Sequence, residues 1–408
     1  MLTGYTIGRF DPKKDWRDEL KEKVPGVKWV DPRNNEQSSI KRLNNDDFGE
    51  NGVNGSYFSY GHVDNGKVIG TTSYAEVGDA WALGKPLIIA DENSHADPLL
   101  EEIFSYLFPS DEEAAKYLRK NADHLKAMDH RPIRKKGSIS SFDNILFAGD
   151  LEGAKNTIER LSHRHGVFEA QNISEAKKLI PKTDLVVINF EKGYNPVGVS
   201  YLGIAYGMGI NSISLDGNKI LYPPLTGLAK IVFMGDNRGE NFMDFIQNPR
   251  ICSRYQLSSQ IESAKAHARS AGLESDDKTK KNIEYNSIYF SGSSWELMEL
   301  KENMKGKKEI HENFSSQTDL AVIEISNDIQ KNQKSFWDIA YAYEMRTPVL
   351  LLHEGDIAHR ELIELSRRPL FGEARYQQAR EYLENLKSQI IEDEAKVYYN
   401  LMNKFNSV

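Results

Sequence analysis

The chain has few of the residues that build disulfides, metal clusters or membrane spans. Cys252 is the only cysteine among 408 residues, which excludes an intrachain disulfide and a cluster of thiolate ligands. The 10 histidines form no His-x-x-x-His or His-Glu-x-x-His pattern of the kind that binds zinc. No apolar run approaches the roughly 18 residues that cross a bilayer, and the first residues lack a secretory pattern. We therefore expect a cytoplasmic protein without cofactor or metal, in which Cys252 is dispensable.

An excess of positive charge is also absent. The sequence holds 52 Lys and Arg residues against 60 Asp and Glu residues, a formal net charge of −8. This balance argues against binding to a nucleic-acid backbone. A composition of 39% hydrophobic and 27% charged residues is ordinary for a globular protein, and the length allows two or three domains.

The most informative stretch runs from Gly70 to Asp91 and reads GTTSYAEVGDAWALGKPLIIAD. Ser73 and Glu76 stand three residues apart, the spacing of a capping box, which predicts a helix with Glu76 in its first turn. A Gly-Lys-Pro turn then leads into an apolar strand, Leu87 to Ala90. Glu76 would thus lie where ligands bind in open α/β sheets, either as a catalytic carboxylate or only as a cap of its own helix.

This stretch resembles the signature of the nucleoside 2-deoxyribosyltransferase family, in which Gly-Thr-x-x-Glu-hydrophobic-Gly-x-Ala leads into Ala-Leu-Gly-Lys-Pro and a strand. The residues on that pattern are Ser73, Glu76, Val77, Gly78, Ala80 and Ala82 to Pro86. Thr72-Ser73 stands where the family has Gly-Thr, so the hydroxyl is kept and the glycine is lost. The resemblance implies a Rossmann-like fold and cleavage of an N-glycosidic bond.

The key stretch recurs twice in the chain, at Gly198 to Leu215 and at Ser335 to Leu352. Alignment of Ala80 with Ala205 and Ala342 places an aromatic residue after the alanine in all three copies. Each copy then runs into an apolar strand. Such a recurrence indicates internal repeats, although α/β segments can also resemble one another by composition alone.

Upstream of each copy of the key stretch lies a short strand that ends in a glycine loop. This strand is followed by a helix and then by a second short strand. The first strands are expected at Tyr5 to Arg9, Ile145 to Asp150 and Ile288 to Ser293, the second at Val27 to Val30, Val167 to Ala170 and Glu309 to His311. Strands alternating with helices predict parallel sheets with right-handed crossovers. We therefore expect an α/β protein of three tandem Rossmann-like or flavodoxin-like domains: residues 1–142, 143–286 and 287–408.

Several connecting segments have a clear pattern of their own. Residues 97–128 predict one or two amphipathic helices with a new N-cap at Ser110, and residues 130–141 form a basic linker. Residues 360–405 predict a long charged helical region that packs across a neighbour or a sister subunit.

The three copies differ in their carboxylates. At the position of Glu76 the second copy has Tyr201 and the third has Asp338, while Ser73 corresponds to Gly198 and Ser335. The second copy is therefore expected to be an inactive scaffold. Ser335 and Asp338 could form a second site, but Asp is one methylene shorter than Glu and also suits dipole compensation in a first turn.

The resemblance implies a role for each remaining residue. Glu76 would attack or stabilise C1′ of the sugar, and Thr72, Ser73, Gly8 and Arg9 would hold its 5′-hydroxyl or 5′-phosphate. Asp64 is expected to contact sugar or base, and His62 either protonates the leaving base or has a structural role.

We expect a nucleoside or nucleotide as the substrate, with no membrane or nucleic-acid partner, and both a monomer and a homo-oligomer stay open. Hydrolysis and exchange share a first half-reaction, so the residues do not separate them. A nucleotide-binding or sensing protein without turnover and a transferase that uses a nucleotide sugar remain the alternatives.

Overall fold

The computed structural model describes most of the chain. The described residues are 1–8, 15–35, 39–67, 69–93, 98–128, 142–191, 193–218, 225, 227–247, 265–266, 285–315, 317–326, 332–355 and 357–384. Arg9, Cys252, the linker at 130–141 and the segment after residue 384 lie outside them. The stretches just before residues 142 and 285 do as well, so the domain boundaries near 142 and 286 stay predictions.

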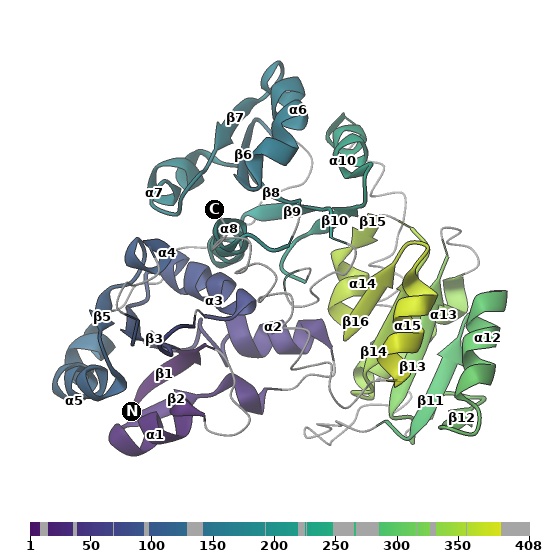
Figure 1. The fold of residues 1–408 in the computed structure, drawn as a ribbon, viewed down its shortest axis with the longest axis horizontal. Helices are drawn as coiled ribbons and strands as arrows, with labels where there is room; N and C mark the ends of the chain where they lie inside the picture. The colour runs from purple at the N-terminus through teal and green to yellow at the C-terminus, as the bar shows by residue number, and fades with distance from the viewer. Residues whose placement is uncertain are drawn as a thin grey trace.

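The first copy contains a sheet of five parallel strands in the order β2-β1-β3-β4-β5 (Figure 1). Its strands are β1 (Leu2–Ile7), β2 (Val27–Val30), β3 (Phe58–Val63), β4 (Leu87–Asp91) and β5 (Tyr106–Phe108). Its helices are α1 (Trp16–Lys23), α2 (Ile40–Phe48), α3 (Thr71–Ala82), α4 (Pro98–Glu101) and α5 (Asp111–Ala127), with a short turn η1 (Pro32–Asn34).

The second copy repeats this arrangement in the order β7-β6-β8-β9-β10. Its strands are β6 (Asn144–Gly149), β7 (Gly166–Glu169), β8 (Leu185–Phe190), β9 (Asn211–Asp216) and β10 (Ile231–Met234). Its helices are α6 (Leu151–Ser162), α7 (Ala176–Leu179), α8 (Pro196–Met208) and α10 (Arg238–Gln247), with a turn η2 (Ile180–Lys182). β8 reads LVVINF and is buried along its whole length, as expected for a parallel strand covered on both faces.

The third copy has the order β12-β11-β13-β14-β16. Its strands are β11 (Ser287–Ser291), β12 (Glu309–His311), β13 (Leu320–Ile325), β14 (Val349–His353) and β16 (Arg368–Phe371). Its helices are α12 (Trp295–Met304), α13 (Gln333–Glu344), α14 (Arg360–Leu365) and α15 (Arg375–Glu384). All three copies therefore share the flavodoxin-like order 2-1-3-4-5, and the predicted three tandem Rossmann-like domains are confirmed.

The loop after the first strand of each copy turns at a glycine with positive φ. These are Gly8 (φ 143°), Gly149 (φ 90°) and Gly292 (φ 145°). The three glycines provide a structural alignment in which Tyr5, Leu146 and Tyr289 each lie three residues earlier, on the strand. The loops open at the carboxyl edge of each sheet, where α/β proteins bind ligands.

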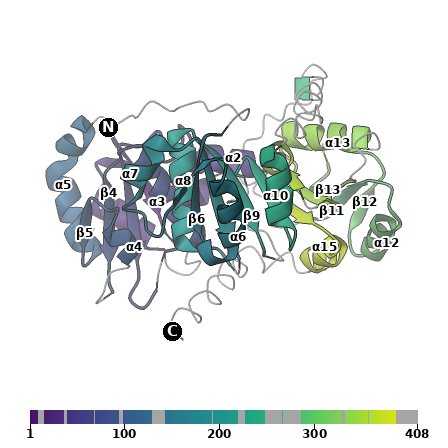
Figure 2. The same cartoon turned by 90° about the horizontal axis from the view of Figure 1, so that it is seen from above.

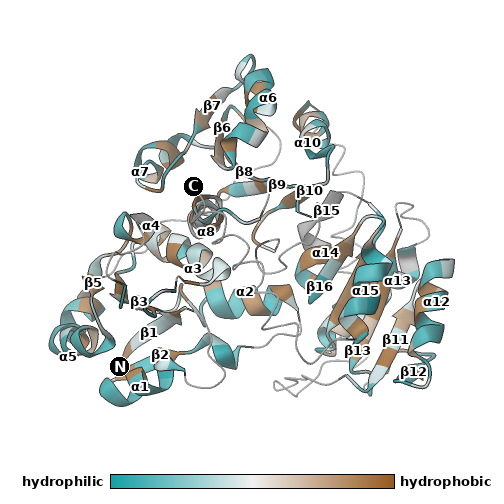
Figure 3. Ribbon diagram, in the orientation of Figure 1, coloured by the Kyte–Doolittle hydropathy of each residue, from teal (hydrophilic) through white to brown (hydrophobic). Residues whose placement is uncertain are grey.

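Buried apolar residues form the cores between each sheet and its helices. Figure 3 colours the ribbon by hydropathy and shows hydrophobic residues on the strands and on parts of the helices. In the first copy, α1 and α5 cover one face of the sheet through a core that includes Trp16 and Leu118. The helices α2 and α3 cover the other face, and their core continues into the second copy around α8. The first two copies are thus packed into one body through the faces that carry α3 and α8.

The contact between α3 and α8 is close and nearly symmetric, and the two helices lie side by side in Figures 1 and 2. A Cβ atom on Gly78 would lie 2.2 Å from the carbonyl oxygen of Ser200, and one on Gly203 would lie 1.9 Å from that of Ala75. Gly78 and Gly203 are equivalent in the repeat, as are Ala75 and Ser200. The first two copies therefore meet as a pseudo-twofold pair, with each glycine facing the backbone of the other helix.

The third copy contacts both of the others. β15 (Ile357–His359) pairs antiparallel with β10 and so extends the second sheet. The backbone amide of Ile40, at the start of α2, donates to the carbonyl of Ser366 at 3.0 Å. The third copy thus holds the N-terminus of a helix that belongs to the first.

Two predictions on connecting segments are wrong in part. The region 97–128 contains β5 as well as helices, although Ser110 does cap α5 as predicted. The region from Arg360 to Glu384 is two short helices separated by β16, where one long helical region was expected. Both strands lie after the recurring stretch of their copy, so the repeat did not predict them. Within the described ranges, no helix is long and apolar enough to cross a bilayer.

Candidate active site

Glu76 lies in the second turn of α3, not in the first. The helix begins at Thr71 with Gly70 as N-cap, and no side chain caps it. The predicted capping box of Ser73 and Glu76 is therefore wrong. Several consecutive small residues can start this helix, and a three-residue spacing cannot select among them. Glu76 consequently has no capping role in its own helix.

The Glu76 carboxylate is buried and faces β1. The hydroxyl of Tyr5 donates to Glu76 Oε1 at 2.7 Å, and both side chains are in the core between the sheet and its helices. Burial raises the pKa of Tyr5 well above its ordinary value, and the charges of Asp47 and Glu76 raise it further. The phenol therefore stays protonated and orients the carboxylate.

A second carboxyl group, that of Asp47 on α2, completes this cluster. Asp47 is 5% exposed, receives a hydrogen bond from the amide of Asn35 and interacts with the Tyr5 hydroxyl. Burial, and next the negative charge of Glu76, raise the pKa of Asp47 well above its ordinary value. The raised pKa favours the protonated form of Asp47 beside Glu76.

Thr72 and Ser73 occupy the first turn of α3, where Ser73 is buried and Thr72 is half-buried. Gly8 follows β1 directly, and a Cβ atom there would lie 3.1 Å from the carbonyl oxygen of His62. These three predicted substrate contacts thus surround the carboxyl end of β1 and the start of α3. Arg9 lies outside the described residues, so its role stays a prediction.

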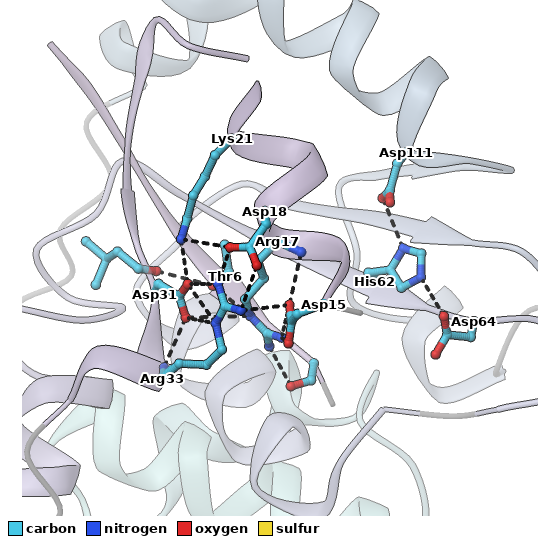
Figure 4. A network of polar contacts seen from close by, with 12 residues as sticks. Thr6, Asp15, Arg17, Asp18, Lys21, Asp31, Arg33, His62, Asp64 and Asp111 are labelled. Carbon is cyan, nitrogen blue, oxygen red and sulfur yellow. Dashed lines mark hydrogen bonds and ion pairs between the residues drawn. The ribbon is translucent and has the colours of Figure 1, made fainter. Parts of the chain in front are cut away.

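Asp64 and His62 form a separate cluster, seen at the right of Figure 4. His62 Nε2 lies 3.2 Å from Asp64 Oδ1, and His62 Nδ1 lies 3.0 Å from Asp111 Oδ1. Trp16 stacks on the imidazole with ring centroids 5.1 Å apart. Burial lowers the pKa of His62, but the hydrogen bonds and charges of Asp111 and Asp64 outweigh it, so the pKa is raised overall.

The sheet separates this histidine cluster from Glu76. Thr6 pairs with Tyr60 in register, so Thr6, Tyr60 and His62 point to the face covered by α1 and α5, whereas Tyr5 points to the opposite face. Asp64 is bonded to His62 and to Lys67 at 2.9 Å, which lowers its pKa despite partial burial. The structure brings Tyr5, Asp47 and Glu76 together and leaves Asp64 with His62.

Arg17 is the centre of a third polar cluster, at the left of Figure 4. Its fully buried guanidinium donates to Thr6 Oγ1 at 3.2 Å, to the Gly8 carbonyl at 2.6 Å and to Asp15 at 3.1 Å. Burial lowers the pKa of Arg17, opposed by Asp15 and then Asp31. Arg17 therefore ties the end of β1 to the start of α1 and fixes the loop glycine beside the site.

The third copy has an equivalent phenol–carboxylate pair with a different neighbour. Asp338 Oδ2 accepts from Tyr289 at 2.9 Å, from Ser291 at 2.5 Å and from Lys334 at 2.9 Å. The Lys334 ammonium also donates to the Tyr289 hydroxyl, and these two partners raise the pKa of Lys334 against partial burial. Ser335 is buried one helical turn before Asp338. In the third copy the neighbour of the carboxylate is therefore a partly exposed cation on the same helix.

The second copy lacks both members of the pair. Leu146 stands at the position of Tyr5, and the hydroxyl of the buried Tyr201 donates to the carbonyl of Asn172 at 3.0 Å. Tyr201 therefore packs between α8 and the chain before α7, consistent with a scaffold.

Tyr5, Asp47 and Lys334 were not identified as site residues from the sequence. A signal for the tyrosines was present, because Tyr5 and Tyr289 each stand three residues before the loop glycine. Asp47 had no comparable signal, since nothing in its helix recurs in the other copies. Among the described residues no group of three His, Cys, Asp or Glu side chains is arranged to hold a metal ion.

Comparisons with known proteins add little to this geometry. No protein-family model and no curated protein sequence matches the chain. One of the solved structures that align with it is from Ralstonia solanacearum and is assigned as a D-3-phosphoglycerate dehydrogenase oxidoreductase. It is 9% identical, aligns over 63% of this chain and 95% of its own, and has a TM-score of 0.17. That score is too low to support an argument about function.

Proposed function

We propose that the first copy cleaves or exchanges the N-glycosidic bond of a nucleoside or nucleotide. One observation carries the proposal: a buried carboxylate, Glu76, is oriented by the Tyr5 hydroxyl beside a second carboxyl group, Asp47, with a raised pKa. Pairs of acids whose pKa values are pushed apart are typical of glycosidic bond cleavage. The resemblance of the stretch around Glu76 to nucleoside 2-deoxyribosyltransferases supports the same reaction.

The two acids have complementary roles in this reaction. Departure of the base builds positive charge at C1′, which the ionised Glu76 stabilises or captures as a glycosyl ester. The protonated Asp47 donates its proton to a ring nitrogen of the leaving base. Water or a second base then attacks C1′ and releases Glu76, while Asp47 takes back a proton.

The first turn of α3 is proposed to hold the sugar. Thr72 and Ser73 offer hydroxyl groups there, and Gly8 allows close approach of the backbone at the end of β1. These groups suit a 5′-hydroxyl or 5′-phosphate. Asp64, which lies with His62, would contact the substrate only at the rim of the sheet.

A binding or sensing role without turnover is the second candidate, and it applies to the third copy. Lys334 forms an ion pair with Asp338 at 2.9 Å, so the charge of that carboxylate is partly neutralised. An ion-paired Asp suits ligand binding better than bond cleavage.

The experiment is chromatography of nucleosides, 2′-deoxynucleosides and their 5′-monophosphates after incubation with the protein, with and without a second free base. Release of free base, or appearance of a new nucleoside, is expected from the parent and not from Glu76→Gln. Retention of a ligand without any product would favour the binding candidate, and equal turnover by Glu76→Gln would remove Glu76 from the mechanism.

A further inference from the structure

Asn44 on α2 is a buried amide whose two polar atoms have no hydrogen-bond partner. The side chain belongs to a residue that is 4% exposed, and neither Oδ1 nor Nδ2 is bonded within the part of the chain that the structure describes. A buried amide left without partners costs free energy, and almost all such groups in folded proteins are satisfied. The Asn44 amide is therefore left for water or a ligand to satisfy, because no described residue does so.

Asn44 lies on the same face of α2 as Asp47, one turn closer to the carboxyl edge of the sheet. Both residues are buried together with Ile40 and Phe48, and these apolar neighbours share a core with Tyr5. Helices of parallel α/β units run antiparallel to the strands, so α2 and α3 both begin at the carboxyl edge. Asn44 is the fifth residue of α2 and Glu76 the sixth of α3, so at 1.5 Å per residue they lie at depths of about 6 and 7.5 Å.

The second copy leaves room for this amide. A Cβ atom on Gly227 would lie 2.7 Å from Asn44 Nδ2 and 2.3 Å from Ile40 Cγ2. Only glycine at that position lets the second copy pack against α2 without displacing Asn44. The Asn44 amide thus lies between Gly227 of the second copy and α2, the helix that carries the proposed acid Asp47.

We propose that Asn44 binds the exocyclic substituent of the leaving base. The inference rests on the proposed function, because Asp47 on the same helix face is the group that protonates that base. An amide can donate through Nδ2 to an oxo group or accept through Oδ1 from an amino group after rotation by about 180°. The ligand class is therefore a nucleobase with an amino or oxo substituent, and both types are accepted.

The test is binding of free bases to the intact protein by calorimetry. The pairs are adenine with hypoxanthine and cytosine with uracil, and unsubstituted purine is the reference. The dissociation constants of the parent for the two members of a pair should agree within about tenfold. Purine should bind at least roughly tenfold more weakly, because a site that hydrogen-bonds a group rejects the analogue that lacks it.

Two variants separate the roles of the amide. The carboxylate of Asn44→Asp can only accept hydrogen bonds. This variant should therefore still bind bases with an amino group, and its affinity for bases with an oxo group should fall by roughly tenfold or more. Asn44→Leu should bind substituted and unsubstituted bases alike, and its melting temperature should be at least that of the parent. The exposed neighbour Asn45, changed to Asp and to Leu, is the matched control and should leave every ratio unchanged.

If the ratios of dissociation constants between bases are the same in the parent, Asn44→Asp and Asn44→Leu, the assignment is overturned and Asn44 is a group satisfied by water. The assignment is also overturned if the parent binds no free base. The chromatographic assay of base release tests the proposed function separately. If base release depends on Glu76 but the affinity ratios between bases do not depend on Asn44, only this inference fails. If the ratios follow Asn44 and no bond is cleaved, the base site stands and the cleavage proposal fails.

Discussion

The first and third copies place the same two groups together but beside different neighbours. Each has a tyrosine three residues before the loop glycine, and its hydroxyl donates to a carboxylate on the helix after the third strand, α3 or α13. In the first copy a second acid, Asp47, lies beside the pair, whereas in the third copy Lys334 forms an ion pair with Asp338. The fold thus sets the geometry of the tyrosine and the carboxylate, and the group beside this pair differs between the two copies.

The largest expected effect is the difference between the two carboxylates. Glu76→Gln should lower the rate of base release by roughly 10³-fold or more, since it removes the charge that meets C1′. Asp338→Asn should change the same rate by less than about twofold, because Asp338 is already paired with the Lys334 ammonium group. Steady-state rates of both variants check this, and equal losses would mean that both copies react.

The second effect concerns Asp47 and pH. Its pKa is raised by burial and then by Glu76, so the proton it donates is lost as pH rises through that raised value. The rate of base release should therefore fall on the alkaline side of the pH–rate profile. Asp47→Asn should lower the rate by about 10²-fold and abolish this alkaline fall. A pH–rate profile with no alkaline fall in the parent would contradict this role.

The raised pKa also affects stability. The folded state holds a proton on Asp47 that the unfolded chain has released, so the contribution of Asp47 to the free energy of unfolding declines over the same rise in pH.

The third effect tests the contact that joins the first two copies and that the third does not share. Gly203→Ala should destabilise the protein by about 2 kcal/mol or more, because its Cβ would meet the carbonyl of Ala75, despite the better helix propensity of alanine. Ala340, the equivalent residue in the third copy, already carries this methyl group. Gly26→Ala, which meets nothing within 4 Å, is the control and should stay within about 0.5 kcal/mol in urea unfolding.

The fourth effect compares the two tyrosines. Tyr5→Phe removes a hydrogen bond to a buried carboxylate and should lower the rate of base release by roughly 10- to 100-fold. Tyr289→Phe should leave that rate unchanged. Both variants keep the ring, so circular dichroism should match the parent, and an equal loss in both would show that the phenols act through the fold.

The smallest effect is expected at Lys334. Its side chain is 71% exposed, so its ion pair with Asp338 is screened by water. Lys334→Thr, which copies Thr72 of the first copy, should change stability by about 0.5 kcal/mol or less. A larger loss in thermal unfolding would assign the lysine a structural role.

The sequence alone was sufficient for the architecture and for one member of the site. Glycine loops and apolar strands recur at a regular spacing, so three parallel sheets could be predicted, whereas β5 and β16 lie after the stretch that recurs and were missed. Glu76 was found by resemblance. Asp47 could not be found, because its pairing with Tyr5 depends on how α2 packs across β1.

The position of α3 also depended on information beyond local pattern. Thr71, Thr72 and Ser73 can each start a helix, and only tertiary packing places the beginning at Thr71. For the same reason His62 and Glu76, close in sequence, could not be assigned to opposite faces of the sheet until the register of β1 with β3 was known.

The glycine-to-backbone contact between α3 and α8 has a consequence for how the protein behaves on dilution. In a pair of separate subunits such a contact would dissociate at low concentration, but here both helices belong to one chain and their local effective concentration is set by the connecting residues. The helix that carries Glu76 therefore keeps its partner at any protein concentration. Activity per molecule should be the same at nanomolar and micromolar protein, which an obligate dimer of single domains could not achieve.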